Sequence, residues 1–342
     1  MRRPIVLTLS LLLAGLAAAC APAADDGAPV ADGTEPPADE TLVIYSGRNE
    51  NLIGPLLDQL EEAVGSPVEV RYASSSELAA QLLEEGESTD ADLFFSQDAG
   101  ALGALAKADM LATLDETVVA AVPAEYRDSA NRWVATSARA RVLAYDPAQV
   151  PQIDTITSID QLLEPQYAGV LGYAPSNASF HAFVTALRVD RGEDGARKWL
   201  EAFRDQRPQA FENNNAVLDA VDSGQVAIGL INHYYWFQKV AEVGEISARL
   251  HYLSSDDPGA LVNVAGVGVL ASSDARDAAL RAVEFLLSDT AQQYFVDETS
   301  EYPVVPGIAH DLPPLTERHR IDLNDLDSLE ETLTMLDEVG LT

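Results

Sequence analysis

The sequence lacks most of the groups from which compact catalytic and structural sites are built. It has one cysteine among 342 residues, so no disulfide can form within the chain. The five histidines are scattered, and no Cys/His cluster with zinc spacing and no H-E-x-x-H pair occurs. A phosphate-cradling glycine loop and a G-x-S-x-G nucleophile elbow are also absent. We therefore expect a protein that is not an enzyme.

Basic residues are also scarce. The chain has 21 Lys and Arg residues against 55 Asp and Glu residues, which gives a formal net charge of −34. This excess argues against a nucleic-acid partner, because phosphate binding needs the opposite sign. It fits a general attraction for cations, and it also fits an acidic surface suited to high salt, where screening relieves self-repulsion.

No apolar run is long enough for a comfortable membrane span. The longest one, 4–16, is shorter than the about 20 residues that a spanning helix needs. It follows two arginines and precedes three alanines, which predicts a secretion signal over 1–19. The next residue, Cys20, resembles the lipobox cysteine of bacterial lipoproteins, and we expect it to carry a lipid. An incidental cysteine is the alternative.

Residues 21–40 contain four prolines, six carboxylates and no basic group. Such a segment cannot bury enough apolar area to offset chain entropy, so it predicts a disordered tether. We expect a lipidated tether over 20–40 to place the folded part outside the cytoplasm, anchored to the cell membrane by lipid alone or located in the periplasm.

Beyond the tether, strands and helices alternate. The hydrophobic periodicity predicts strands at 42–45, 68–72, 92–95, 169–173, 226–231 and 263–270, and helices at 52–64, 75–85, 100–108, 178–189, 194–204, 216–222, 275–287, 291–296 and 323–339. This order predicts an α/β fold with a mostly parallel sheet covered by helices on both faces. The extended segment 133–145 and the strand 263–270 are suited to pass between two lobes.

The most informative motif is the pair Tyr234-Tyr235. It follows the apolar run 226–231 and Asn232, a residue type that often caps a helix. Both phenols are therefore predicted at a strand-to-helix turn, where an open α/β sheet usually binds its ligand. A turn can aim both rings at one point, and two phenolates suit a hard cation such as Fe³⁺. Taken alone, the pair is more often one core and one surface aromatic.

Further candidates have both a functional and a structural interpretation. Arg139, Arg141 and Tyr145 share one face of a predicted strand, so the arginines favour ionisation of the phenol, or they pair with carboxylates. Arg48 follows a tight turn and is suited to hold an anion. The helix start after Pro175 and the polar turn at Asn214 offer free N–H groups to an oxyanion, or simply cap their helices.

Several strings, in order, resemble the ferric-ion-binding substrate-binding proteins of bacterial ABC transporters. They are V-I-Y-S-G-R at 43–48, S-T-D-A-D-L-F-F at 88–95, W-V-A at 133–135, R-A-R-V-L-A-Y at 139–145, N-H-Y-Y at 232–235, D-P-G-A at 257–260, G-V-G-V at 266–269 and E-Y-P at 301–303. The resemblance covers essentially everything after the tether.

The resemblance implies a two-lobed periplasmic-binding-protein fold of type II, with each lobe a mostly parallel sheet flanked by helices and a ligand cleft at the hinge. One lobe would hold 41–136 and 265–315, and the other 137–264 and 316–342. Fe³⁺ would be bound by Tyr145, Tyr234 and Tyr235. A synergistic anion, carbonate, bicarbonate or phosphate, would be bound by residues drawn from Arg48, Arg141, Asn177, Ala178, Ser179, Asn214 and Asn232. A monomer would deliver the ion to an ABC transporter permease.

Two positions depart from the transferrin-like members of that family. Asn49 stands where they have a histidine, and Gln97 stands where they have a glutamate. Neither amide is a good ligand for ferric ion, which favours a site of three tyrosines completed by the anion, with Glu50 as a further candidate donor. The same fold binding an organic cation, an oxyanion or another metal is the alternative function.

Overall fold

The computed structural model describes residues 41–315 and 321–342. The predicted signal peptide, Cys20 and the tether lie outside the described residues. Within the described ranges, no helix is both long enough and apolar enough to cross a membrane.

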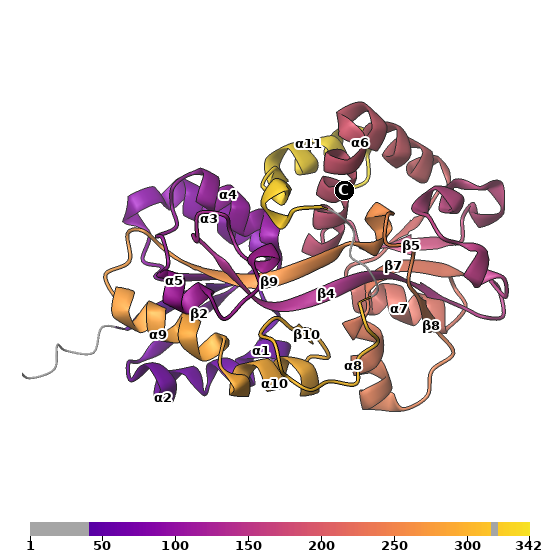
Figure 1. The fold of residues 1–342 in the computed structure, drawn as a ribbon. Coiled ribbons are helices and arrows are strands. Elements are labelled where there is room, and N and C mark those ends of the chain that lie inside the picture. The colour runs from indigo at the N-terminus through magenta and orange to yellow at the C-terminus, as the bar shows by residue number, and fades with distance from the viewer. Residues whose placement is uncertain (1–40, 316–320) are drawn as a thin grey trace, which may run out of the picture. The chain divides into compact units, whose positions relative to one another are not determined.

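The strands form one ten-stranded mixed sheet in the order β2-β1-β3-β9-β4-β7-β5-β6, with β10 and β8 also paired to β4 (Figure 1). Their bounds are β1 Leu42–Ser46, β2 Val68–Tyr72, β3 Leu93–Ser96, β4 Val134–Tyr145, β5 Leu171–Tyr173, β6 Gln209–Ala210, β7 Ile228–Asn232, β8 Arg249–His251, β9 Val262–Val269 and β10 Tyr302–Pro303. All the strands predicted from periodicity are present. The short β6, β8 and β10 carry too few residues to show a period.

The middle of the sheet corrects the prediction of mostly parallel strands. β1 runs parallel to β2 and β3, and β5 runs parallel to β6 and β7, as the β-α-β order predicts. Between these two groups, β9 is antiparallel to β3 and β4, and β4 is antiparallel to β7. The residues of β4 up to Ala140 pair with β9 and β10, whereas those from Arg141 pair with β7 and β8. This strand therefore belongs to both halves of the sheet.

Helices follow most strands. They are α1 Glu50–Leu57, α2 Leu60–Val64, α3 Ser75–Glu85, α4 Ala99–Lys107, α5 Glu116–Val119, α6 Ala178–Asp205, α7 Asn214–Asp222, α8 Tyr234–Val243, α9 Arg276–Leu286, α10 Asp289–Asp297 and α11 Leu329–Val339. The predicted helix over 52–64 is two helices, α1 and α2. The predicted helices over 178–189 and 194–204 are both present within α6, where the non-helical Gly192, with a φ of 70°, separates them by a kink.

The buried side chains form two clusters. The larger one includes β1, β3 and β9, the helices packed on them, and Val217 and Leu218 of α7. The smaller one joins the end of β4, β5, β7 and α6 to Met335, Leu336 and Val339 of α11. The last helix therefore packs against elements that precede it by more than a hundred residues.

Gly47 lies in the turn after β1, so a substitution at this position measures how tightly this end of the sheet is packed. A Cβ at this position would lie 2.1 Å from Ser75 Oγ and 2.8 Å from Ser75 Cα, at the start of α3. We expect Gly47→Ala to lower the free energy of unfolding by about 1–3 kcal/mol, because the backbone must shift to relieve the overlap. Gly54→Ala in α1 is the matched control, since its nearest neighbours lie 3.9 Å away. Urea titration of both variants gives the comparison, and equal stabilities would contradict it.

Candidate functional site

The tyrosine pair lies at the predicted strand-to-helix turn. β7 ends at Asn232 and α8 begins at Tyr234, so His233 alone forms the junction. The His233 backbone N–H donates to the Ala140 carbonyl at 3.0 Å, and the Ala140 N–H donates to His233 Nδ1 at 3.2 Å. Burial lowers the pKa of His233 to about 4, so the imidazole is neutral and can accept this hydrogen bond. The junction is thereby fixed to β4.

The two phenols lie against each other below the surface. The Tyr234 and Tyr235 rings are stacked with centroids 4.2 Å apart, and the residues are 1% and 8% exposed. Burial and then the neighbouring Tyr235 raise the pKa of Tyr234 well above its ordinary value. A phenol held in this way remains protonated near neutral pH unless a strong positive charge displaces its proton.

Two buried arginines of β4 supply positive charge next to this pair. Arg139 acts on Tyr234 and lowers the pKa of that phenol, against the larger effect of burial. Burial lowers the pKa of Arg141 to about 9, and the nearby Tyr235 partly restores it. Neither guanidinium forms an ion pair with a carboxylate in the part of the chain that the structure describes. The charge of Arg139 also acts on the buried carboxyl of Asp98, the N-cap of α4, and lowers its pKa against the larger effect of burial. Two phenolates, or a bound anion, would provide further countercharge, above all for Arg141.

Arg141 also connects the tyrosines to the start of α6. It lies opposite Asn232 in the register of β4 and β7, and its Nη1 donates to the Ser179 carbonyl at 3.2 Å and to Ser179 Oγ at 3.4 Å. Ser179 Oγ donates to Asn177 Oδ1 at 2.7 Å and accepts from Asn214 Nδ2 at 3.0 Å. Five of the predicted anion-binding residues are therefore close together.

The first turn of α6 adds backbone donors to this group. Asn177 is the N-cap, and its Oδ1 accepts from the Ser179 N–H at 3.0 Å. Ala178 is the first helical residue, a position whose N–H has no partner within the helix. The helix dipole also favours negative charge here. The structural interpretation, ordinary capping, holds for Asn177, while Ala178 keeps a donor for a ligand.

Gln97 reaches the pair from the other half of the sheet. It directly follows β3, its backbone N–H donates to Ser75 Oγ at 2.8 Å, and its Nε2 lies 3.3 Å from Tyr234 Oη. The side chain can donate to a phenolate but carries no charge to offer a cation. Tyr234 is therefore contacted from both halves of the sheet.

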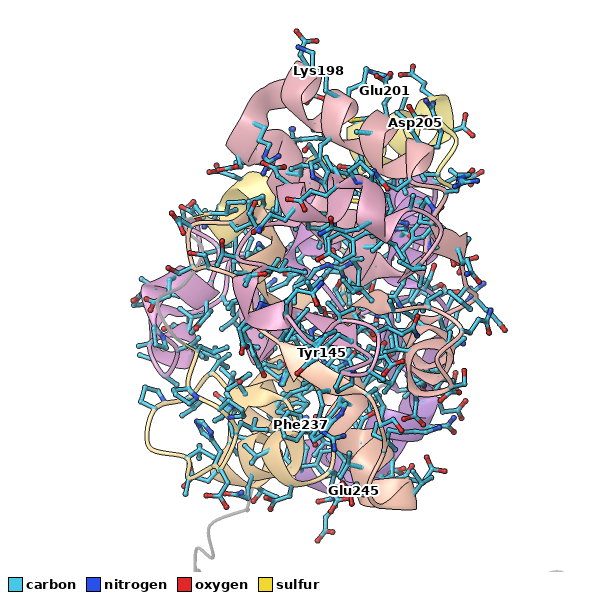
Figure 2. All side chains as sticks on the ribbon, turned by 90° about the vertical axis from the view of Figure 1, so that its right-hand side faces the viewer. Tyr145, Lys198, Glu201, Asp205, Phe237 and Glu245 are labelled. Atoms are coloured by element: carbon cyan, nitrogen blue, oxygen red, sulfur yellow. The ribbon has the colours of Figure 1, made fainter. Side chains whose placement is uncertain are left out.

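Tyr145 lies away from the pair along β4, which argues against the expectation of a three-tyrosine site. In the antiparallel register Tyr145 faces Ile228, the first residue of β7, whereas Tyr234 and Tyr235 follow its last residue. At about 3.3 Å per residue, four strand positions separate the two ends by about 13 Å. Both ends belong to the same pair of strands, so a movement between the halves of the sheet leaves this separation along β4 and β7 unchanged. Figure 2 shows Tyr145 on the face that forms the right-hand side of Figure 1.

Arg48, a predicted anion-binding residue, already has a buried acidic partner. Its Nη2 lies 2.8 Å from Glu301 Oε1, and both side chains are at most 1% exposed. Its Nη1 donates to Ser137 Oγ at 3.4 Å, and Ser137 in turn donates to Glu301. A buried guanidinium already neutralised by a carboxylate has little charge to offer an anion. Glu50 is exposed at the start of α1, which its neighbour Asn49 caps.

Arg139 is the residue that the sequence prediction left out of the site. Its side chain is 2% exposed, and its Nε and Nη1 have no hydrogen-bond partner among the described residues. The even spacing of Arg139, Arg141 and Tyr145 in the sequence already indicated that both arginines lie on one face of the strand. In the structure the two arginines do lie beside phenols. The phenols are those of α8 rather than the one on the same strand. No group of three His, Cys, Asp or Glu side chains within the described ranges is arranged to hold a metal ion.

Comparisons with known proteins agree with this fold. Residues 88–329 match the family model described as bacterial extracellular solute-binding protein. The chain is 34% identical over 311 residues to the Fe(3+)-binding periplasmic protein of Serratia marcescens, covering 89% of this chain and 91% of that protein. It is 31% identical to the major ferric iron-binding protein of Neisseria meningitidis, covering 89% of this chain and 94% of that one.

A comparison with solved structures agrees with the sequence comparison. Iron-bound HitA from Pseudomonas aeruginosa superposes with a TM-score of 0.83 at 33% identity, over 88% of this chain and 99% of that one. The α/β fold is that of the type II periplasmic binding proteins, as the sequence predicts, and a solute-binding family agrees with the expectation that the chain is not an enzyme. The chain therefore belongs to the bacterial extracellular solute-binding proteins, and ferric-ion-binding periplasmic proteins are among its relatives.

Proposed function

We propose that this protein binds Fe³⁺ through the phenolates of Tyr234 and Tyr235, together with a synergistic anion, and delivers the ion to an ABC importer. One observation carries the proposal: two buried, stacked phenols lie beside two buried arginines that form no ion pair with a carboxylate among the described residues. The names of the relatives support the choice of ferric ion as the cargo.

The charges of the site suit this cargo. Fe³⁺ prefers hard oxygen donors, and the neutral His233 is turned toward the β4 backbone rather than toward the pair. Two phenolates leave part of the trivalent charge uncompensated, so the remainder must come from an anion. Carbonate, bicarbonate or phosphate would be held by Arg139 and Arg141, the Ala178 N–H and the amides of Asn214 and Asn232. Asn177 and Ser179 would orient these donors through their own hydrogen bonds.

The same arginines support a second candidate, an oxyanion as the cargo with no metal. Arg139 and Arg141 are 2% and 4% exposed and form no ion pair within the described ranges, and buried cations of this kind favour a small anion. An organic cation is disfavoured by the same two charges. The stacked phenols distinguish the two candidates, because an oxyanion alone does not require them.

Cellular delivery completes the proposal. A lipid on Cys20 and the acidic tether would hold the folded part at the outer face of a membrane, where a permease can accept the ion. The protein would act as a monomer whose two lobes, joined through β4 and β9, close over the ion and open to release it. Labelling with a radioactive fatty acid, lost in Cys20→Ala, tests the anchor.

The binding step can be tested on purified protein. Adding Fe³⁺ and bicarbonate together is expected to produce a phenolate-to-iron charge-transfer band in the visible region, with one iron per chain by metal analysis. Phosphate in place of bicarbonate tests the identity of the anion. A protein that stays colourless, yet gains thermal stability from phosphate alone, would favour the oxyanion and overturn the proposal.

A further inference from the structure

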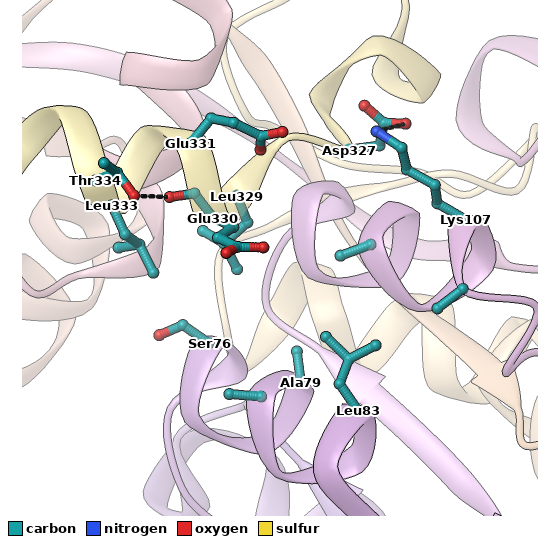
Figure 3. Close-up of a pocket in the computed structure, with 13 residues that line it drawn as sticks. Ser76, Ala79, Leu83, Lys107, Asp327, Leu329, Glu330, Glu331, Leu333 and Thr334 are labelled. Atoms are coloured by element: carbon teal, nitrogen blue, oxygen red, sulfur yellow. Dashed lines mark hydrogen bonds and ion pairs between the residues drawn. The ribbon is translucent and has the colours of Figure 1, made fainter. Parts of the chain in front are cut away.

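A groove away from the tyrosine site combines apolar walls with unpaired acidic groups. It lies between α3 and α4 on one side and α11 on the other, and has a volume of about 510 Å³ (Figure 3). Leu83 of α3 and Leu333 of α11 line it from opposite sides, and they are 46% and 37% exposed. Only four large hydrophobic side chains in the described ranges are exposed, and two of them meet here. Such a concentration is typical of a surface that a partner covers.

The groove continues at both ends. Toward the ends of α3 and α4 it meets a hollow that shares Leu83 and Ala108. Toward α6 it meets another hollow that shares Glu330, Glu331 and Thr334. The three hollows are therefore neighbours along α3, α4, α11 and α6, and we refer to them together as the trough.

The charges along the trough are mainly negative, which favours a basic partner. Its two cations are already paired, Lys107 with Asp327 at 3.5 Å and Arg197 with Glu338 at 2.6 Å. Glu87, Glu330 and Glu331 form no ion pair within the part of the chain that the structure describes. A second copy of this chain is a poor occupant, because the net charge of −34 repels it. The occupant that fits is a segment with apolar side chains flanked by Lys or Arg.

The two walls belong to different parts of the core. α3 and α4 place Leu82 and Leu105 in the larger cluster, whereas α11 places Met335 and Leu336 in the smaller one. Arg188 of α6 fastens α11, since its Nη1 donates to Thr332 Oγ1 and to the Ser328 carbonyl, each at 2.8 Å.

On the other side, the 3₁₀ turn Leu323–Leu326 packs on α4. A Cβ added to Gly100 would lie 2.8 Å from the Leu326 carbonyl oxygen, and one added to Gly103 would lie 2.9 Å from Asp327 Cβ. Leu329, the first residue of α11, still packs on the larger cluster, so the crossing from one wall to the other falls within the first turns of α11. A change in the relative orientation of the two clusters would alter the width of the groove.

We propose that this groove is the docking site for a basic, amphipathic segment of the ABC permease, and that its affinity depends on iron loading. The proposal rests on the function proposed above, because ligand-driven closure supplies the change in width. By thermodynamic linkage, if iron loading raises the affinity of the groove for the permease segment, binding of that segment raises the affinity for iron by the same factor.

Charge insertion tests the groove against a matched surface position. Leu83→Glu and Leu333→Glu are each expected to lower iron uptake about tenfold in cells that lack the chromosomal copy of the gene. Val243→Glu is the control, because Val243 is a 56% exposed hydrophobic residue of α8, outside the groove. The purified variants are expected to bind Fe³⁺ like the wild type, which shows that they fold. Wild-type uptake by both groove variants, or an equal loss in Val243→Glu, would overturn the proposal.

A second measurement does not depend on the cargo. A photo-crosslinking amino acid placed at 333 in the full chain is expected to capture the membrane subunit of the transporter, identified by mass spectrometry, whereas the same group at 243 is not. Absence of that subunit from the product at 333 would reject the groove. A wild-type protein that crosslinks but binds no iron would instead reject the function proposed above.

Discussion

Replacing either paired tyrosine by phenylalanine is expected to abolish the visible ferric band and to lower the affinity for Fe³⁺ at least about a thousandfold. The change removes one of two anionic donors and leaves a buried apolar ring, so the iron loses a bond and the trivalent charge is less well balanced. Removing a directly bonded oxygen costs more than the about 10–100-fold typical of a supporting residue. Absorption spectroscopy and competition with a chelator measure both effects.

Tyr145→Phe is the matched control for these variants. This tyrosine is about four strand positions from the pair along β4, so its loss is expected to leave the band and the affinity unchanged. The comparison separates a two-tyrosine site from the three-tyrosine site that the sequence resemblance implies. Loss of the band in Tyr145→Phe, with Tyr235→Phe still coloured, would contradict the assignment made from the structure.

The turn that carries the pair could be predicted because its signals are local. An apolar, β-branched run ends at Asn232 and two aromatic residues follow, which places a strand and then a helix start without knowledge of the rest of the chain. The same is true of the capped start of α6. Such local patterns gave most of the strands, and they also gave Asn177, Ser179 and Asn214 as neighbours of a helix end.

The position of Tyr145 could not be predicted in the same way. Even spacing correctly places Arg139, Arg141 and Tyr145 on one face, but it does not say how far along the strand the neighbouring turn lies. That distance is set by the register between β4 and β7, which pairs Arg141 with Asn232 and Tyr145 with Ile228. Register depends on packing between distant segments, so a single sequence leaves it open.

Arg48 shows a related limit of sequence reasoning. An arginine in a turn near a strand end can bind either an anionic ligand or the carboxylate of a side chain, and the local sequence does not distinguish the two. Its partner, Glu301, lies 253 residues away in sequence, and only the folded chain shows that this carboxylate is buried against it. The converse applies to Arg139, which forms no ion pair within the part of the chain that the structure describes and whose Nε and Nη1 have no hydrogen-bond partner there.

Lowering the pH is expected to weaken iron binding steeply, by up to about a hundredfold per pH unit if both phenols release a proton to the metal. Burial raises the pKa of Tyr234, so the free protein holds this phenol protonated throughout the neutral range. Each proton that the metal must displace adds one factor of ten per pH unit to the apparent affinity. Competition with a chelator between pH 6 and pH 8, corrected for the chelator's own protonation, measures the slope.

The same phenol should also make the stability of the iron-free protein depend on pH, in a different pH range. A raised folded-state pKa means that the folded form keeps its proton above about pH 10, where the unfolded chain loses it. The contribution of Tyr234 to stability is therefore fully present below that pH and is lost as the pH rises further. Tyr234→Phe should remove this part of the alkaline decline, measured by urea unfolding of both proteins. An iron affinity that does not change with pH would show that the phenols are not the ligands, whatever the stability data give.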